Sequence, residues 1–111
     1  MNNSQQKENE PASTLNILSF NTRSLGKQPK RRQVLNALKK KDVDILFLVD
    51  TRFAKSIESK VKAEWGGTAL FSSFTSQARG VAIFFRKNIP VDILDKKSDN
   101  DGNILSLLIK T

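Results

Sequence analysis

The sequence predicts a single α/β (α+β) domain built from a mixed β-sheet and two helices. In the first half, a strand, a helix and a second strand follow one another, and the second strand is a continuous apolar run typical of a buried parallel strand. The second half holds short apolar segments joined by short turns, a pattern that favours antiparallel pairing. With 111 residues, 38% of them hydrophobic, the chain is long enough for one hydrophobic core.

Residues 1–14 form a polar segment with one proline and no bulky apolar side chain after Met1. This composition predicts a disordered tail, so we expect the folded domain to span residues 15–111. The segment also lacks the apolar stretch of a signal peptide, and no run in the chain has the length of a transmembrane helix. We therefore expect no membrane partner.

The first half predicts a strand over Leu15–Phe20, a turn over Asn21–Gly26 and a helix over Lys30–Lys41. Pro29 suits the first turn of that helix, and its apolar residues form one stripe. The run Asp44–Asp50 predicts a strand covered on both faces. A strand, helix, strand order implies parallel pairing through a right-handed crossover.

The second half predicts another helix, because Ile57, Val61 and Trp65 recur at four-residue spacing and two glycines follow. Four strands then complete the chain: Ala69–Phe74, Val81–Arg86, Val91–Leu94 and Ile104–Ile109. We expect the core to contain Leu18, Ile45, Phe47, Val81, Ile83 and Leu107.

Three residue types are missing from the chain, and their absence excludes whole classes of chemistry. Without Cys there is no disulfide-linked partner, no thiolate zinc site and no thiol nucleophile. Without His there is no histidine base, triad or metal ligand, and Tyr is absent as well. Carboxylates, amides, hydroxyls and positive charge remain as the groups that can act.

Polar residues follow the two predicted parallel strands where each strand ends. Asn21 follows Phe20, and Asp50 follows Val49. Parallel neighbours bring both side chains to the carboxyl edge of the sheet, where ligand crevices form in open α/β sheets. A carboxylate beside an amide oxygen is a candidate site for Mg²⁺. The alternative is structural, with Asn21 as a turn residue and Asp50 as the N-cap of the second helix.

A run of basic residues without any acid is the second candidate site. Its eight members match the formal net charge of +8, and such a run attracts polyanions such as DNA. The alternative is a solvated helix face, although such faces usually interleave Glu with Lys. The members are Arg23, Lys27, Lys30, Arg31, Arg32, Lys39, Lys40 and Lys41.

Four motifs in order resemble the amino-terminal part of the endonuclease/exonuclease/phosphatase superfamily: Asn16–Asn21 with Leu25, the pair Arg31 and Arg32, Asp44–Thr51, and Arg79–Ile83. Within it, the sequence is most similar to the apurinic-endonuclease-like domains of non-LTR retrotransposons. The resemblance implies the amino-terminal half of a two-sheet α/β sandwich. It also implies a nuclear enzyme that hydrolyses DNA phosphodiester bonds with Mg²⁺, for which Mn²⁺ can substitute.

Carried over by position, Asn21 lines the metal site and Asp50 takes the place of the family's metal-binding glutamate. The chain departs from the family at Val49-Asp50-Thr51, where relatives usually have Gln-Glu-Thr, because the shorter Asp withdraws the carboxylate by about 1.5 Å. Asn103 also stands where retroelement relatives often have Arg.

The resemblance further implies that a Tyr, an Asp-x-Asn pair and an Asp-His pair of the active site are missing. We therefore expect a truncated endonuclease domain that is inactive alone, and we expect self-association through the sheet face that a second sheet covers in the family. The other hypothesis is a non-catalytic basic module that binds nucleic acid. A phosphatase of small substrates is a third hypothesis, to which the basic helix is less suited.

Overall fold

A computed structural model describes residues 14–111 of the chain. Of the predicted tail, only Thr14 is among the described residues. The elements are β1 (Ile17–Asn21), α2 (Gln28–Lys39), β2 (Ile45–Val49), the 3₁₀-helix η1 (Lys55–Ile57), α3 (Glu58–Trp65), β3 (Thr68–Ser72), β4 (Val81–Phe85), β5 (Asp92–Ser98) and β6 (Leu105–Lys110).

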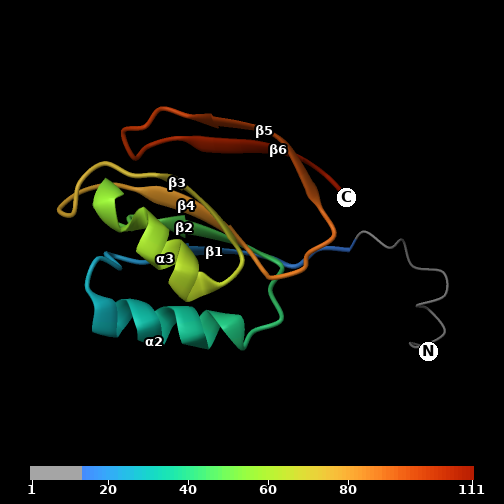
Figure 1. Ribbon diagram of the computed structural model, residues 1–111, viewed down its shortest axis with the longest axis horizontal. Helices are drawn as coiled ribbons and strands as arrows, with labels where there is room; N and C mark the ends of the chain where they lie inside the picture. Colours follow the sequence, from blue (N-terminus) through green and yellow to red (C-terminus); the bar gives the residue numbers. More distant parts are fainter. Residues whose placement is uncertain (1–13) are drawn as a thin grey trace.

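The structure has mixed α/β content, which confirms the predicted fold class (Figure 1). Its larger sheet has the strand order β1-β2-β4-β3, and β5 pairs with β6 in a second, two-stranded sheet. As predicted, β1 and β2 are parallel, whereas β4 is antiparallel to both β2 and β3. The larger sheet is therefore mixed, with its parallel pair at one edge.

One predicted pairing is wrong: the short connection between β4 and β5 does not form a hairpin. Strand β4 already lies between β2 and β3, so neither of its edges is free for β5. The chain instead crosses to the second sheet, where β5 extends to Ser98 rather than to Leu94. The apolar pattern did not predict the last residues of β5, because Asp95, Lys96 and Lys97 are charged and exposed to solvent.

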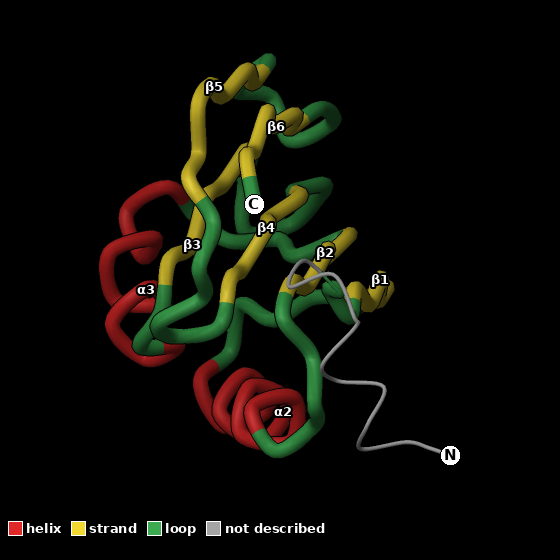
Figure 2. The backbone as a smooth tube through the Cα atoms, turned by 90° about the vertical axis from the view of Figure 1, so that its right-hand side faces the viewer, coloured by secondary structure: helices red, strands yellow, loops and turns green. Residues whose placement is uncertain are grey.

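The helices cover one face of the larger sheet, and the β5–β6 sheet lies against the other (Figures 1 and 2). On the helical face, Leu35 of α2 and Trp65 of α3 are buried with Leu48 and Phe84 of the sheet. The indole N–H of Trp65 donates a 2.8 Å hydrogen bond to the carbonyl oxygen of Phe85, which fixes α3 to β4.

The opposite face is covered over only part of its area. Ile45, Ile83 and Phe85 are buried beneath the β5–β6 sheet. Phe47, however, is 40% exposed and Val49 is 41% exposed. The prediction that β2 is covered on both faces, with Phe47 in the core, is therefore wrong, because two strands are too few to cover the whole sheet.

The other predicted core residues are buried to different degrees. Ile45 and Ile83 belong to the core, as predicted. Leu18, Val81 and Leu107 are half-buried, and Leu18 and Leu107 pack against the edges of the two apolar clusters.

Neither α2 nor α3, the two α-helices within residues 14–111, is long and apolar enough to cross a membrane.

Candidate functional site

The loops at the carboxyl ends of β1 and β2 are joined into one backbone network at a single edge of the larger sheet. The β1–α2 loop bonds to the β2–η1 loop, which bonds to the β3–β4 loop, and this in turn bonds to the β5–β6 loop. The backbone N–H of Ser24 donates to the carbonyl oxygen of Asp50 at 2.8 Å. In the same way, the N–H of Arg52 donates to the carbonyl oxygen of Arg79 at 2.8 Å, and that of Gly80 donates to the carbonyl oxygen of Gly102 at 3.0 Å.

Several non-glycine residues in these loops have left-handed backbone conformations. The φ angles are 50° at Arg23, 84° at Ser24, 57° at Asp50, 52° at Arg52, 63° at Arg79 and 61° at Asn100. Each such residue costs about 1–2 kcal/mol, so the surrounding hydrogen bonds must hold it in place. Strained backbone concentrates at functional sites, and three of these six residues are arginines. This loop edge is therefore the first candidate site.

Asn21 and Asp50 both reach the loop edge, as the parallel pairing predicts. Asn21 lies beside Val49 in the register of β1 and β2, and Asp50 is the next residue. The side-chain oxygen of Asn21 accepts a 3.1 Å hydrogen bond from the backbone N–H of Arg23, as in an ordinary turn. Asp50 does not cap the second helix, because the residues that precede η1 and α3 are Ala54 and Ile57.

The carboxylate of Asp50 is held by the guanidinium of Arg52. The Nε and one terminal nitrogen of Arg52 lie 2.8 and 3.1 Å from the two carboxylate oxygens, a bidentate geometry. This contact raises the pKa of Arg52, first through the hydrogen bond and then through the charge of Asp50. Both oxygens of Asp50 are thus already engaged by a cation.

These residues do not fit the Mg²⁺ or Mn²⁺ site that the resemblance implies. A magnesium ion requires carboxylate oxygens that are free to coordinate it. The guanidinium of Arg52 donates to both carboxylate oxygens of Asp50, and the amide oxygen of Asn21 accepts a hydrogen bond from the backbone N–H of Arg23. Between residues 14 and 111, no three acidic side chains lie together in a group that could hold a metal ion.

The basic run between Arg23 and Lys41 contains one side chain that is buried. Arg31 is 2% exposed, and its guanidinium donates to both carboxylate oxygens of Glu64, at 2.6 and 3.1 Å. It also donates to the carbonyl oxygen of Gly26 at 2.9 Å. The hydrogen bond from Arg31 lowers the pKa of Glu64. Arg31 therefore joins α2 to α3, and its buried, ion-paired guanidinium weighs against the expectation that it contacts nucleic acid.

Two lysines of the run donate to backbone carbonyls. The Nζ of Lys30 lies 3.1 Å from the carbonyl oxygens of Thr22 and Arg23, and that of Lys39 lies 2.7 Å from the carbonyl oxygen of Glu64. These contacts leave the positive charge uncompensated. Lys30 thereby adds its charge to the loop edge, at the amino-terminal end of α2.

The five other members of the run have exposed side chains. None of them lies within 4.0 Å of a carboxylate of residues 14–111. Lys27 precedes the first turn of α2, which contains no acidic residue and whose N-cap makes no side-chain hydrogen bond. The helix dipole adds positive potential at that end. The five are Arg23, Lys27, Arg32, Lys40 and Lys41.

Two arginines of the loop edge, Arg52 and Arg79, were not among the predicted site residues. Arg52 was not predicted, because only the left-handed conformations of Asp50 and Arg52 bring residues two apart into an ion pair. The sequence pattern marks Arg79 only as the first residue of the motif Arg79–Ile83. Its guanidinium carbon lies 4.3 Å from the ring centroid of Phe74, which is 38% exposed. An aromatic residue just after a strand, with an Arg in the same loop, was the available signal.

Comparison of the chain with protein-family models and with curated proteins gives no match. The likeness to the endonuclease/exonuclease/phosphatase superfamily thus remains a resemblance of short motifs.

Proposed function

We propose that the chain is a non-catalytic module that binds nucleic acid through its phosphates, along α2 and the loop edge. One observation carries this proposal. Of the eight basic residues between Arg23 and Lys41, only Arg31 is neutralised by a carboxylate within residues 14–111. The other seven keep uncompensated charge, which favours contact with a polyanion.

The distribution of the charges suits a linear ligand better than a small one. Arg23 and Lys27 lie at the amino-terminal end of α2, whereas Lys40 and Lys41 follow its carboxyl end. A helix of 12 residues is about 18 Å long, which corresponds to about five phosphates along one strand of a duplex. A DNA backbone can therefore contact both ends of the surface at once.

Arg79 and Phe74 extend the proposed surface at the loop edge. An exposed aromatic ring with a guanidinium against it offers a stacking platform to an unpaired base and a cation to its phosphate. Binding that does not depend on sequence is expected from such contacts, because every base has a face on which to stack.

The metal-dependent endonuclease implied by the resemblance is the second candidate. It is favoured by one observation, namely that Asn21 and Asp50 reach the same edge of the sheet. The bidentate contact of Arg52 weighs against it, because a metal ion has to displace that arginine first.

The proposal is tested by charge reversal on two matched surfaces. The full chain is mixed with a labelled DNA duplex, and the fraction bound is measured at low salt. We expect the variant Arg23→Glu, Arg32→Glu, Lys40→Glu, Lys41→Glu to lose binding. The control variant Lys87→Glu, Lys96→Glu, Lys97→Glu, Lys110→Glu lowers the net charge equally at exposed positions and should retain it. Equal loss in both variants means that only net charge matters and contradicts the proposed surface.

A further inference from the structure

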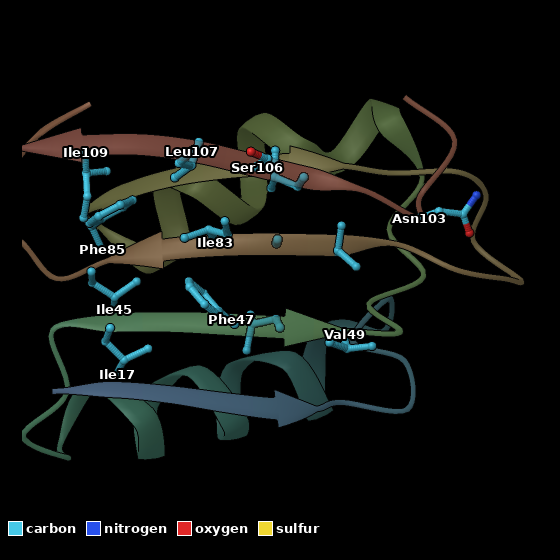
Figure 3. Close-up of a pocket in the computed structure, with 14 residues that line it drawn as sticks. Ile17, Ile45, Phe47, Val49, Ile83, Phe85, Asn103, Ser106, Leu107 and Ile109 are labelled. Atoms are coloured by element: carbon cyan, nitrogen blue, oxygen red, sulfur yellow. The ribbon is translucent and has the colours of Figure 1, made fainter. Parts of the chain in front are cut away.

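An apolar groove lies on the face of the larger sheet away from the helices. It encloses about 430 Å³ between β6 on one side and the exposed face of β1, β2 and β4 on the other (Figure 3). At its open side, Ile17 is 52% exposed, Phe47 is 40% exposed and Val49 is 41% exposed. Three neighbouring large apolar side chains at one site indicate a surface that a partner covers.

One wall of this groove is an unpaired strand edge. Strand β6 pairs with β5 and with no other strand in residues 14–111. The groove is lined by residues of β6 but by none of β5, so the free edge of β6 is the edge that borders it. An unpaired edge presents a row of backbone N–H and C=O groups that can bind an added strand.

The side chains of β6 alternate as they do in a half-buried sheet. Leu105, Leu107 and Ile109 face the larger sheet and are half-buried, whereas Leu108 is 59% exposed on the other side. Strand β6 lies over Ile83 and Phe85 of β4. A strand paired with the free edge of β6 would lie about 4.8 Å from β6, which places it over β2 and above Phe47 and Val49.

The first residues of the chain are poor candidates for this added strand. Apart from Met1 and Ala12, residues 1–13 contain no hydrophobic side chain. They lack the alternating apolar residues needed to cover Phe47 and its neighbours.

A second copy of the chain is also disfavoured. If β6 of a second copy paired with β6 of the first, it would lie over β2 of the first copy. In each copy, however, β4 lies directly beneath β6. Strand β4 of the second copy would therefore collide with β2 of the first. Each copy also carries a net charge of +8, so the two repel one another.

We propose that an extended segment of another protein adds to β6 as a third strand of the second sheet. Its alternate side chains are apolar and bury Ile17, Phe47 and Val49. Acidic residues flank them, because the chain carries a net charge of +8 and attracts an acidic partner. This site lies on the face opposite α2 and is independent of the proposed binding of nucleic acid.

The test uses the full chain and a short synthetic peptide with valine at alternate positions, threonine between them and glutamate at both ends. The control peptide has methylated backbone nitrogens on the edge that would pair with β6. Titrations followed by amide NMR signals should show binding of the first peptide, with shifts in Leu105–Lys110. The control peptide should not bind, because methylation removes the hydrogen bonds but keeps the side chains.

Variants of the chain locate the site. Ile17→Asp and Val49→Asp place a negative charge at exposed positions of the groove, where it opposes both the apolar contact and the acidic ends of the peptide, and should weaken peptide binding at least about tenfold. Leu108→Asp, on the outer face of β6, should leave peptide binding unchanged. All three variants should retain the far-UV circular dichroism of the wild type and its DNA binding.

Three results would overturn this inference. The first is equal binding of both peptides, which indicates an apolar pocket without strand pairing. The second is peptide binding unaffected by Val49→Asp. The third is a wild-type dimer in sedimentation that Val49→Asp converts to a monomer, which assigns the groove to a second copy of the chain.

Discussion

At the scale of single residues, the arginines of this chain have three different roles. Arg31 is buried against Glu64, Arg52 occupies the carboxylate of Asp50, and Arg23 lies exposed at the loop edge. Their neighbours in sequence do not reveal these roles. Glu64, for example, lies 33 residues after Arg31. Burial and a distant carboxylate decide whether a cation is available to a ligand.

The first prediction concerns hydrolysis. We expect the full chain, incubated with supercoiled plasmid in Mg²⁺ or Mn²⁺, to nick no more DNA than its Asp50→Ala variant does. The physical reason is that Arg52 engages both oxygens of Asp50. Metal-dependent nicking that disappears in Asp50→Ala would show instead that the pair opens and that the resemblance extends to catalysis.

The second prediction concerns the ion pair of Arg31 and Glu64. Glu64→Gln leaves the guanidinium of Arg31 buried without a counter-charge, and should lower the free energy of unfolding by about 3 kcal/mol at neutral pH. Urea unfolding measures this change. The control Asp92→Asn, at an exposed position, should change it little. Equal effects of the two substitutions would contradict the structural role of Arg31.

The third prediction is the pH dependence of the same pair. Arg31 holds the pKa of Glu64 below that of an ordinary glutamate, so the ionised form is favoured in the folded state. The stabilisation is therefore present above about pH 4.3 and is lost as the pH falls through the lower pKa of the folded state. The difference in unfolding free energy between wild type and Glu64→Gln should shrink over that acidic range. A constant difference would contradict the assignment.

At the scale of secondary structure, the sequence pattern predicted the order of elements and the parallel pairing of β1 and β2. The continuous apolar run of β2 identified a strand within an α/β sheet correctly. It did not show how wide the covering layer is, and so placed Phe47 in the core. Pairing partners of β4 likewise depend on which edges are already occupied, which the short β4–β5 connection does not reveal.

The fourth prediction compares the two glycines that end α3. Gly66 has φ 86° with open space around it, so Gly66→Ala should cost about 1 kcal/mol of backbone strain. A Cβ on Gly67 would instead collide with the carbonyl oxygen of Phe85 and approach Nε1 of Trp65 to 2.9 Å. It would disrupt the bond between those two residues.

Thermal or urea unfolding of the two alanine variants tests this comparison. Gly67→Ala should be clearly the less stable, with a changed tryptophan fluorescence, whereas Gly66→Ala should keep the wild-type spectrum. The reverse order of stability would contradict the described contact of α3 with β4.

At the scale of the whole molecule, the chain presents two different faces. Helix α2 and the β5–β6 sheet lie on opposite sides of the larger sheet (Figure 2). The basic surface follows α2 and the loop edge, whereas the apolar groove lies between β6 and the larger sheet. Composition predicted the basic run, because it contains no acid. It could not predict Arg52, Arg79 and Phe74, which reach the loop edge through left-handed turns and loop packing. The proposed site is therefore only partly visible in the sequence.

The salt dependence of DNA affinity tests the central claim most directly. Anisotropy titrations of the full chain with a labelled duplex, over a series of salt concentrations, give the slope of log K against log salt concentration. Each phosphate contact contributes about −0.9 to this slope. We expect a steep slope for the wild type, and a slope reduced by about 3 to 4 for the neutralised variant Arg23→Gln, Arg32→Gln, Lys40→Gln, Lys41→Gln, which loses four phosphate contacts without added repulsion. An affinity that does not depend on salt, or a slope unchanged in this variant, would contradict phosphate binding by this surface.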